Sequence, residues 1–349
     1  MTGLSVAPAS SLPAPPVMIG NVRLPNPVLL APMSGVTDAP FRRMAARLGA
    51  GLVVSEMAPC AALAAGKRNA RLRLEAPGIG HHVVQLAGCE TGWMAEGARI
   101  AVGEGAEIID INMGCPAKHV TNGEAGSALM RDLDHAVALI DATSAAVDVP
   151  VSLKMRLGWD DRSINAPELA RRAQAAGVKL ITVHGRTRCQ FYTGTADWEA
   201  VRAVKAAVTI PVVVNGDITG FAQAREALAR SGADAVMVGR GAQGRPWFPG
   251  QLARYLATGR EEAAPPLAAQ RDIVFALYDE MLLHHGERIG LKHARKHIGW
   301  ALDSAAATAQ AGEQARKRWR HHVLTAPDRR ETERRLDESF AALAWRVAA

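Results

Sequence analysis

The chain has 349 residues, of which 48% are hydrophobic and 21% are charged. This balance excludes a largely disordered chain and a disulfide-stabilised miniprotein, because it provides enough apolar material for a sizeable core. Lys and Arg exceed Asp and Glu by 41 to 34, a net charge of +7, which favours a polyanionic partner without establishing one. The apolar runs are far shorter than the roughly 20 residues that cross a bilayer, so we expect no membrane segment.

The first residues of the chain are rich in Ala, Ser and Pro, and they lack the positive start and apolar stretch of a secretory signal. We therefore expect a disordered tail over residues 1–17. The four cysteines, Cys60, Cys89, Cys115 and Cys189, form no C-x-x-C pair, and no His stands at zinc-ligand spacing. This pattern favours a reduced cytoplasmic protein without a metal site.

Short runs rich in β-branched residues alternate with helical patterns from residue 28 onwards, which is typical of repeated βα units. Eight such units within about 230 residues predict an α/β fold with a (β/α)8 TIM barrel, not an open doubly wound sheet. The predicted strands are 28–31, 52–56, 82–86, 108–112, 151–156, 180–184, 212–216 and 235–239.

The composition changes after the eighth unit. Residues 257–270 contain a Gly, two Glu and a Pro-Pro pair, a combination typical of a linker. Residues 271–349 have a helical pattern and carry 14 Lys and Arg against 11 Asp and Glu. We therefore expect a catalytic barrel over residues 18–256, a linker, and a smaller all-helical C-terminal domain over residues 271–349.

Nearly every predicted strand is followed by a polar or glycine-rich group. The carboxyl ends of barrel strands meet at one rim, which holds the active site in barrel enzymes, so we expect these groups to share a pocket. Polar residues also follow strands that carry no active site. Only their recurrence after eight strands therefore points to a shared pocket. The groups are Pro32-Met33-Ser34, Glu56, Gln85, Asn112, Lys154, His184, Asn215-Gly216-Asp217 and Gly239-Arg240.

Residues 239–244 fit the pattern G-x-G-x-x-G but lie in the last βα unit, with no second strand to carry the expected acidic residue. We therefore reject a dinucleotide-binding motif. The small residues and Arg240 still suit a phosphate, because backbone N–H groups can approach it closely. Together with residues 215–217 they follow strands seven and eight, where barrels hold phosphates, although a tight turn is the alternative.

Lys154 and His184 are predicted to face the barrel mouth, where they suit an anionic ring system. Reduced flavin carries negative charge at its N1–C2 edge, and Gln85 can bond one of its carbonyls or nitrogens. A surface Lys and a core His are the alternative. Cys115 follows the fourth strand, and beside an anionic flavin its thiol should stay protonated and act as a proton donor. We expect the other three cysteines to be small buried apolar residues.

Several motifs in this order resemble those of the tRNA-dihydrouridine synthases. The most specific is D-I-N-M-G-C-P-A-K at residues 110–118, which continues to Gly126-Ser127. The segment A-R-K-H at 294–297, followed by Trp300, resembles the bacterial B-type branch. The other matching motifs are A-P-M at 31–33, G-V-T-D at 35–38, K-M-R at 154–156, H-G-R-T at 184–187, N-G-D at 215–217 and V-G-R-G at 238–241.

The resemblance implies a flavoenzyme in which NADPH reduces FMN, and the flavin then reduces the C5–C6 double bond of a uridine in tRNA. Flavin N5 would give hydride to C6, and Cys115 would protonate C5 from the other face. Asn112 and Arg186 become candidates for holding the uracil of a flipped nucleotide. No stable protein partner is implied. The implied FMN contacts are Pro32, Met33, Ser34, Gln85, Lys154, His184, Asn215, Gly216, Asp217, Gly239 and Arg240.

Three basic residues of the helical domain, Lys292, Arg295 and Lys296, are spaced i, i+3 and i+4, so they share a helical face. We expect this face, with Arg288 one turn earlier, to bind tRNA phosphates. An ordinary solvated face is the alternative. A second candidate set on the barrel rim is Lys67, Arg68 and Arg71.

Two other functions stay open at this point. An FMN-dependent dihydropyrimidine or dihydroorotate-type oxidoreductase acts on the same double bond in a free base, and chemistry alone does not separate the two. The basic helical domain favours tRNA, because an enzyme acting on a free base does not need it. A non-catalytic RNA-binding protein is the third possibility, against which the presence of Cys115, Lys154 and the phosphate site argues.

Overall fold

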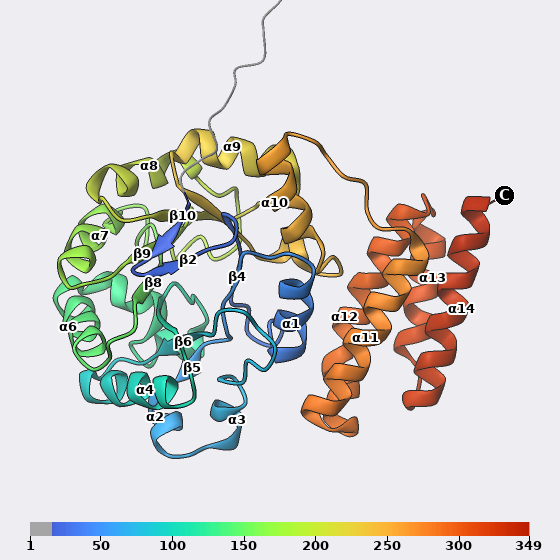
Figure 1. The fold of residues 1–349 in the computed structure, drawn as a ribbon, viewed down its shortest axis with the longest axis horizontal. Coiled ribbons are helices and arrows are strands. Elements are labelled where there is room, and N and C mark those ends of the chain that lie inside the picture. Colours follow the sequence, from blue (N-terminus) through green and yellow to red (C-terminus); the bar gives the residue numbers. More distant parts are fainter. Residues whose placement is uncertain (1–15, 349) are drawn as a thin grey trace, which may run out of the picture.

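The structure is a computed structural model that describes residues 16–348. Figure 1 shows a ring of strands enclosed by helices, with a second group of helices packed on one side. The predicted tail, residues 1–17, lies outside the described residues except for Pro16 and Val17, and Val17 is buried. Within the described range, no helix is both long enough and apolar enough to span a membrane.

Within residues 16–348, nine parallel strands curl into one sheet. The sheet closes because a parallel bridge joins Val54 to Val83. These features confirm the predicted TIM barrel. The strands are β3 (Val28–Leu30), β4 (Leu52–Val53), β5 (Ala58–Pro59), β6 (Val83–Ala87), β7 (Ile108–Met113), β8 (Val151–Arg156), β9 (Leu180–His184), β10 (Val212–Asn215) and β11 (Ala235–Val238).

The second predicted strand, 52–56, differs from the structure because it is split into β4 and β5. Between the two halves, the Ser55 hydroxyl accepts a hydrogen bond from the backbone N–H of Gln85 at 2.9 Å. A side-chain oxygen thus takes the place of a backbone acceptor, and the regular ladder is interrupted there.

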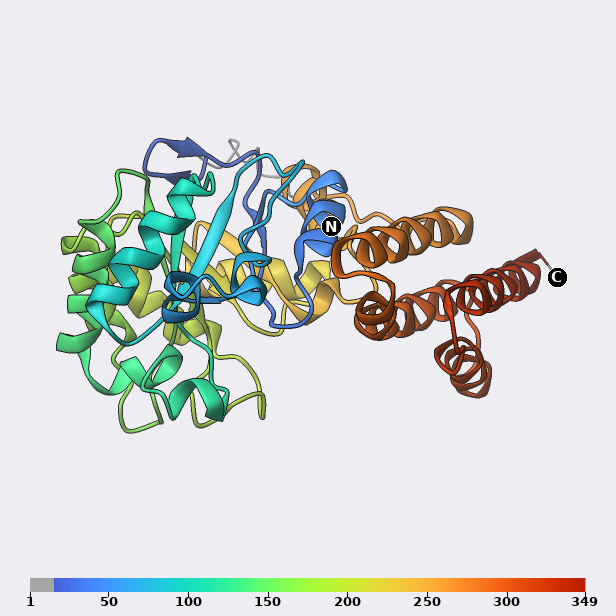
Figure 2. The same cartoon turned by 90° about the horizontal axis from the view of Figure 1, so that it is seen from below.

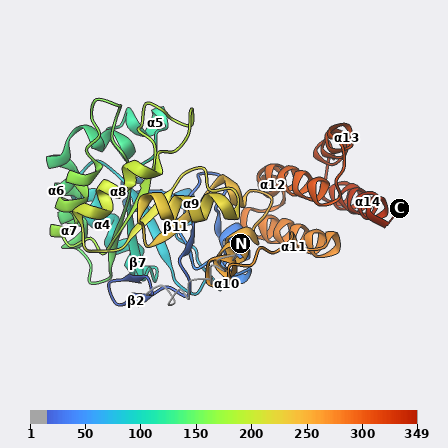
Figure 3. The same cartoon turned by 90° about the horizontal axis from the view of Figure 1, so that it is seen from above.

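Side chains along each strand alternate between the barrel interior and the surrounding helices, as the period of two requires. In β10, Val212 and Val214 belong to the apolar core that includes the outer helices, whereas Val213 belongs to a separate cluster inside the barrel. The hairpin of β1 (Met18–Ile19) and β2 (Val22–Arg23) contributes Ile19 to that inner cluster. Figure 3 shows β2 at the end of the barrel opposite α5 (Lys118–Thr121), so the hairpin leaves the other rim open.

The helices that follow the strands cover the outside of the ring (Figure 1). The first of them begins after Asp38, whose carboxylate accepts the backbone N–H of Phe41 at 3.1 Å and so caps the helix. These helices are α1 (Ala39–Arg47), α2 (Cys60–Ala64), α3 (Arg68–Arg71), α4 (Thr91–Gly103), α6 (Leu133–Ser144), α7 (Ala166–Ala175), α8 (Trp198–Ala207), α9 (Phe221–Ser231) and α10 (Phe248–Thr258).

The C-terminal region consists of α11 (Leu267–His285), α12 (Glu287–Thr308), α13 (Glu313–Leu324) and α14 (Arg329–Ala348). The stretch predicted as a linker, 257–270, is shorter in the structure. Only residues 259–266 are non-helical, because α10 and α11 extend into the predicted range. Figure 2 shows α14 carrying the C-terminus away from the barrel.

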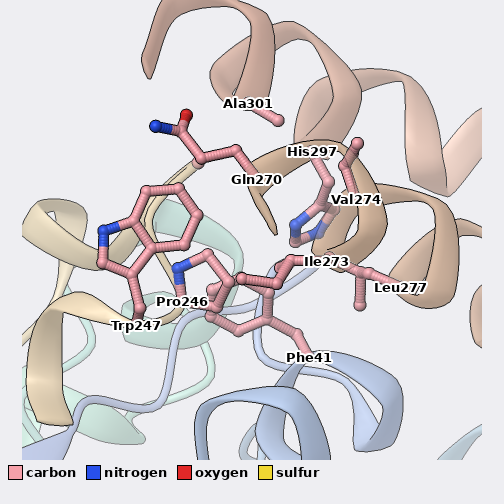
Figure 4. A pocket seen from close by; sticks show the side chains of 10 residues that line it. Phe41, Pro246, Trp247, Gln270, Ile273, Val274, Leu277, His297 and Ala301 are labelled. Carbon is pink, nitrogen blue, oxygen red and sulfur yellow. The ribbon is translucent and has the colours of Figure 1, made fainter. Parts of the chain in front are cut away.

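The helical region joins the barrel through apolar packing of α11 and α12 against α1. The residual space there, which we call the junction pocket, is only about 10 Å³ and is lined by Phe41, Trp247, Leu277 and His297 among others (Figure 4). The rings of Phe41 and His297 lie 5.1 Å apart. One continuous apolar core therefore extends from the barrel helices into the helical region.

Candidate active site

A cavity of about 520 Å³, the rim cavity, opens where the carboxyl ends of the strands meet. Its volume lies within the range of roughly 300 to 1,000 Å³ that is usual for ligand and cofactor sites. All the residues expected to contact FMN line it, from Pro32 in the first loop to Arg240 in the last, and so do Asn112 and Cys115. The remaining uracil candidate, Arg186, is not among the lining residues.

Lys154 lies at an interior position of β8, and its Nζ donates to Asn215 Oδ1 at 3.0 Å. The amide nitrogen of Asn215 in turn donates to the backbone oxygen of Met237 at 2.8 Å, which fixes the orientation of that amide. Burial, together with the nearby charge of Arg156, lowers the pKa of the Lys154 ammonium to about 8. A negative group in the cavity would favour the protonated lysine again, so the position suits an anion.

His184 ends β9 among several cations. Burial holds its pKa well below the usual range, and the charges of Lys154, Arg156 and Arg186 act in the same direction. The imidazole is therefore neutral at physiological pH. Its Nε2 lies 3.4 Å from Nη1 of Arg186, which can only donate, and this contact favours the tautomer with the proton on Nδ1.

The carboxylate of Asp217 connects Arg186 with Arg240. It accepts from Arg186 at 2.9 and 2.6 Å, from Arg240 at 3.0 Å and from the backbone N–H of Ala196 at 2.8 Å. Burial opposes its ionisation, but the hydrogen bonds from Arg186 and Ala196 outweigh burial, and the pKa of Asp217 is lowered. Its backbone has a φ of 53°, which is uncommon for a residue with a side chain.

The structure does not bring Arg186, which we expected to hold the uracil, into the lining of the rim cavity. Its guanidinium is buried, and besides Asp217 it donates to the backbone oxygens of Thr193 at 3.0 Å and Gly194 at 2.7 Å. With the contact to His184, these bonds occupy all five N–H donors of the side chain. Arg186 instead holds Asp217 and the 193–194 loop in place.

Cys115 is partly exposed and lines the rim cavity in the loop after β7. The side-chain oxygen of Asn112 accepts the backbone N–H groups of Gly114 at 3.2 Å and Cys115 at 3.0 Å. The hydroxyl of Ser127 donates to the backbone oxygen of Cys115 at 2.8 Å. These bonds fix the turn that presents the thiol to the cavity.

A buried chain of hydrogen bonds lies beneath this turn, and the sequence reasoning missed its origin at Asp110. One carboxylate oxygen of Asp110 accepts from Ser152 Oγ at 2.6 Å, and the other accepts from Gln85 Nε2 at 2.7 Å. Gln85 Oε1 accepts from Asn112 Nδ2 at 2.7 Å. Because Asp110 accepts at both oxygens, Gln85 must turn its nitrogen toward it, and Asn112 must then turn its oxygen toward the Cys115 loop. Burial raises the pKa of Asp110, and the bonds from Ser152 and Gln85 oppose that rise.

Arg156, which lines the cavity, is another residue that the sequence reasoning did not assign. Its Nε donates to the backbone oxygen of Gly114 at 2.9 Å, and its Nη1 donates to those of Thr187 and Phe191 at 2.7 and 2.9 Å. The guanidinium lies 5.6 Å from the Tyr192 ring, which also lines the cavity. The available signal was its place at the end of the fifth predicted strand.

The other three cysteines differ from one another. Cys60 is buried as expected, and burial raises the pKa of its thiol to about 12. Cys89 is partly exposed and Cys189 is exposed, so the expectation of burial is wrong for both. Both lie outside regular helices and strands, where the periodicity of the sequence gives no indication of burial.

The basic residues of α12 do not all face the same surroundings. Lys292 and Arg295 are exposed, whereas Lys296 is partly buried and its Nζ lies 3.2 Å from the position that a Cβ on Gly35 would occupy. Lys296 therefore reaches toward the barrel loop after β3. In the second candidate set on α3, Lys67 and Arg68 are exposed, and Arg71 lies 3.6 Å from Glu104.

Comparison with known proteins gives sequence matches along most of the chain. The family model described as dihydrouridine synthase matches residues 29–343. A probable tRNA-dihydrouridine synthase of Rhizobium leguminosarum bv. phaseoli is 54% identical over 317 residues, which cover 91% of this chain and 96% of the relative. The tRNA-dihydrouridine synthase B of Pseudomonas aeruginosa is 48% identical over 287 residues, 82% of this chain and 86% of the relative.

Solved structures resemble the fold at low sequence identity. Histamine dehydrogenase from Rhizobium sp. 4-9 matches with a TM-score of 0.53 and 14% identity, over 76% of this chain and 50% of that one. A morphinone reductase variant in complex with tetrahydroNAD matches with a TM-score of 0.51 and 15% identity, over 72% of this chain and 92% of that one. At this level of identity the likeness supports the barrel fold alone.

Proposed function

The chain belongs to the dihydrouridine synthase family, and we propose that its rim cavity reduces the C5–C6 double bond of uridine in tRNA with FMN that NADPH has reduced. The observation that carries the proposal is the meeting of three groups in one cavity: the partly exposed thiol of Cys115, the partly buried amine of Lys154, and Arg240 beside Gly239. The tRNA substrate is supported by the names of the relatives and by the positive charge of the chain. An enzyme that acts on tRNA in a bacterium works in the cytoplasm, where we place this protein.

The residues of the rim cavity fit FMN in charge and in shape. Arg240 and the backbone around Gly239 would hold the phosphate, and Lys154 would lie at the anionic edge of the ring system. At Gly216, with a φ of 116°, a Cβ would lie 2.8 Å from atoms of both Ala196 and His184, so only glycine lets the backbone line the cavity there. When bound and reduced, the flavin supplies hydride for C6 of the uracil.

In the proposed reaction Cys115 holds a proton on Sγ and delivers it to C5, on the face of the base opposite to the flavin. Asn112 keeps its turn in place and has a second N–H on Nδ2 for a uracil carbonyl, because the first N–H goes to Gln85. Arg156 replaces Arg186 as the candidate cation for the base, since it lines the cavity and its Nη2 is not used in the bonds described above.

The test compares substrates for the purified full-length protein. With NADPH and tRNA from a strain that lacks dihydrouridine, we expect mass spectrometry to detect dihydrouridine and the purified protein to release FMN on denaturation. Free uracil and dihydroorotate should remain unchanged under the same conditions. Turnover of a free base without modification of tRNA would overturn the proposal in favour of a dihydropyrimidine-type oxidoreductase.

A further inference from the structure

Three potential metal ligands converge between the barrel and the helical region, away from the rim cavity. Asp38 precedes α1, His285 ends α11 and His293 lies in α12. One ligand atom of each residue lies within 4.8 Å of the ligand atoms of the other two. We call these three residues the Asp–His cluster. Two imidazoles and one carboxylate form a donor set that suits transition metals such as Zn²⁺.

The cluster is held in place before any ion binds. One oxygen of Asp38 caps α1 through the N–H of Phe41, which leaves Oδ2 facing His285 Nε2 at 2.8 Å. The rings of His285 and His293 lie 4.5 Å apart. Two ligands of a tetrahedral zinc ion stand about 3.3 Å apart at metal–ligand distances of about 2.0 to 2.1 Å, so a small separation of Asp38 and His285 makes room for the ion.

The cluster combines one negative group with two nitrogen donors. Asp38 is buried, and His285 and His293 are partly buried. A carboxylate and two imidazoles are groups that bind metal ions in proteins.

Other charged groups near the cluster act in both directions. Glu75 lies 3.2 Å from the His284 ring, next to His285, and adds negative charge. Lys296 and Arg42 add positive charge. The guanidinium of Arg42 is held in place because it donates to the backbone oxygens of Thr37 and Glu75 at 3.2 and 2.6 Å.

We propose that Asp38, His285 and His293 bind one divalent transition-metal ion of the Zn²⁺ class, with water as the fourth ligand. The ion would fasten the α11–α12 hairpin to the barrel. Asp38 follows Thr37, whose hydroxyl accepts the backbone N–H of Met33 at 2.8 Å, and Met33 lines the rim cavity. A metal ion on Asp38 would therefore stiffen the loop that forms one wall of the cavity.

The test measures Zn²⁺ binding to the full-length flavoprotein by equilibrium dialysis and metal analysis. We expect one Zn²⁺ per chain and a higher melting temperature when it is bound. His293→Gln and Asp38→Asn should each weaken binding by at least about tenfold, the loss that even outer partners of a metal can cause. Asn is a good N-cap, so Asp38→Asn should still fold. The matched control is His321→Gln, an exposed histidine of α13, which should bind Zn²⁺ like the parent.

Three results would overturn the proposal. The first is the absence of stoichiometric Zn²⁺ binding at neutral pH. The second is equal binding by the parent, His293→Gln and Asp38→Asn, which would place the ion elsewhere. The third is a loss of stability in these variants that is the same with Zn²⁺ and with chelator, which would leave only a hydrogen-bonded contact. Each of these results can be told apart from a failure of the proposed function, because Zn²⁺ binding is measured without tRNA turnover and no ligand of the cluster lines the rim cavity.

Discussion

Buried polar side chains lie both at the rim cavity and at the junction pocket, but they differ in their hydrogen bonding. At the rim, Asp110, Gln85 and Asn112 form a continuous chain in which each amide has a defined direction. At the junction, His297 is buried, and within residues 16–348 neither of its ring nitrogens has a hydrogen-bond partner. At the rim, residues on neighbouring strands orient one another through hydrogen bonds. At the junction, the neutral imidazole of His297 packs against apolar side chains like an apolar group.

The largest effect is expected at the rim. Cys115→Ala should slow uridine reduction by roughly 10² to 10⁴, the usual contribution of a positioned general acid, while NADPH still reduces the flavin. Stopped-flow absorbance separates the two half-reactions. Cys189→Ala is the control, because that thiol is exposed outside the cavity lining, and it should react like the parent. Equal losses in both half-reactions would assign Cys115 a structural role.

The junction should respond to acid. Burial lowers the pKa of His297 to about 4, below its ordinary value of 6.5, so the unfolded chain binds this proton more readily than the folded one. Stability should therefore fall as the pH drops from about 6.5 toward 4, by on the order of 3 kcal/mol at roughly 1.4 kcal/mol per pKa unit. Urea titrations should show a smaller loss in His297→Leu.

His321→Gln serves as the control for the acid experiment, because this histidine is exposed on α13. It should follow the pH dependence of the parent. If the stability of His297→Leu and of the parent fell equally with pH, His297 would not be the group that titrates. The proposed difference between the polar groups of the rim and the imidazole of the junction would then be unsupported.

The chain of hydrogen bonds from Asp110 through Gln85 to Asn112 gives a second test at the rim. Asp110→Leu leaves Gln85 and Ser152 without their buried partner, which costs about 1 to 3 kcal/mol and should lower kcat roughly ten- to a hundredfold. Asp110→Asn can still accept from Gln85 and donate to Ser152, so it should recover most of the loss. The KM for tRNA should not change in either variant. Failure of Asn to restore kcat would show that the charge of Asp110, and not its hydrogen bonding, is what matters.

The smallest effect is expected on α12. Replacing Lys292 and Arg295 together by Ala should flatten the salt dependence of tRNA affinity by about 1.4 to 1.8 units, since each phosphate contact contributes about 0.7 to 0.9. NADPH oxidation with oxygen as acceptor should continue unchanged. An unaltered slope in filter-binding assays would move the contact to Lys67 and Arg68 on the barrel.

The sequence predicted the rim better than the junction, for a physical reason. His184 and Asn215 end parallel strands, and Lys154 lies two residues before the end of its own. The barrel brings all its strand ends together at one rim, so the position of each residue along its strand implied that they lie close together. Asp110 received no role in the site because it occupies an interior position within an apolar strand, where its partners come from neighbouring strands. The contact of Arg186 with Asp217 was missed for the same reason, since the two residues are 31 positions apart in the chain.

Sequence patterns did not predict the contacts between the barrel and the helical region. Asp38 and His285 are 247 residues apart, and no spacing rule connects a helix cap with the end of a distant helix. The spacing patterns of metal ligands concern Cys and His residues that are close in sequence, so they do not connect Asp38 with His285 and His293.

The apolar core that α1 shares with α11 and α12 has a consequence for how the molecule melts. Phe41 and Met44 on the barrel side belong to the same cluster as Val274 and Leu277 on the helical side. A chain cut after α10 would expose this surface to water and should lose part of the support of its first barrel helix. The two regions should consequently unfold in a single cooperative transition, and the helical region cannot be exchanged like an independent module.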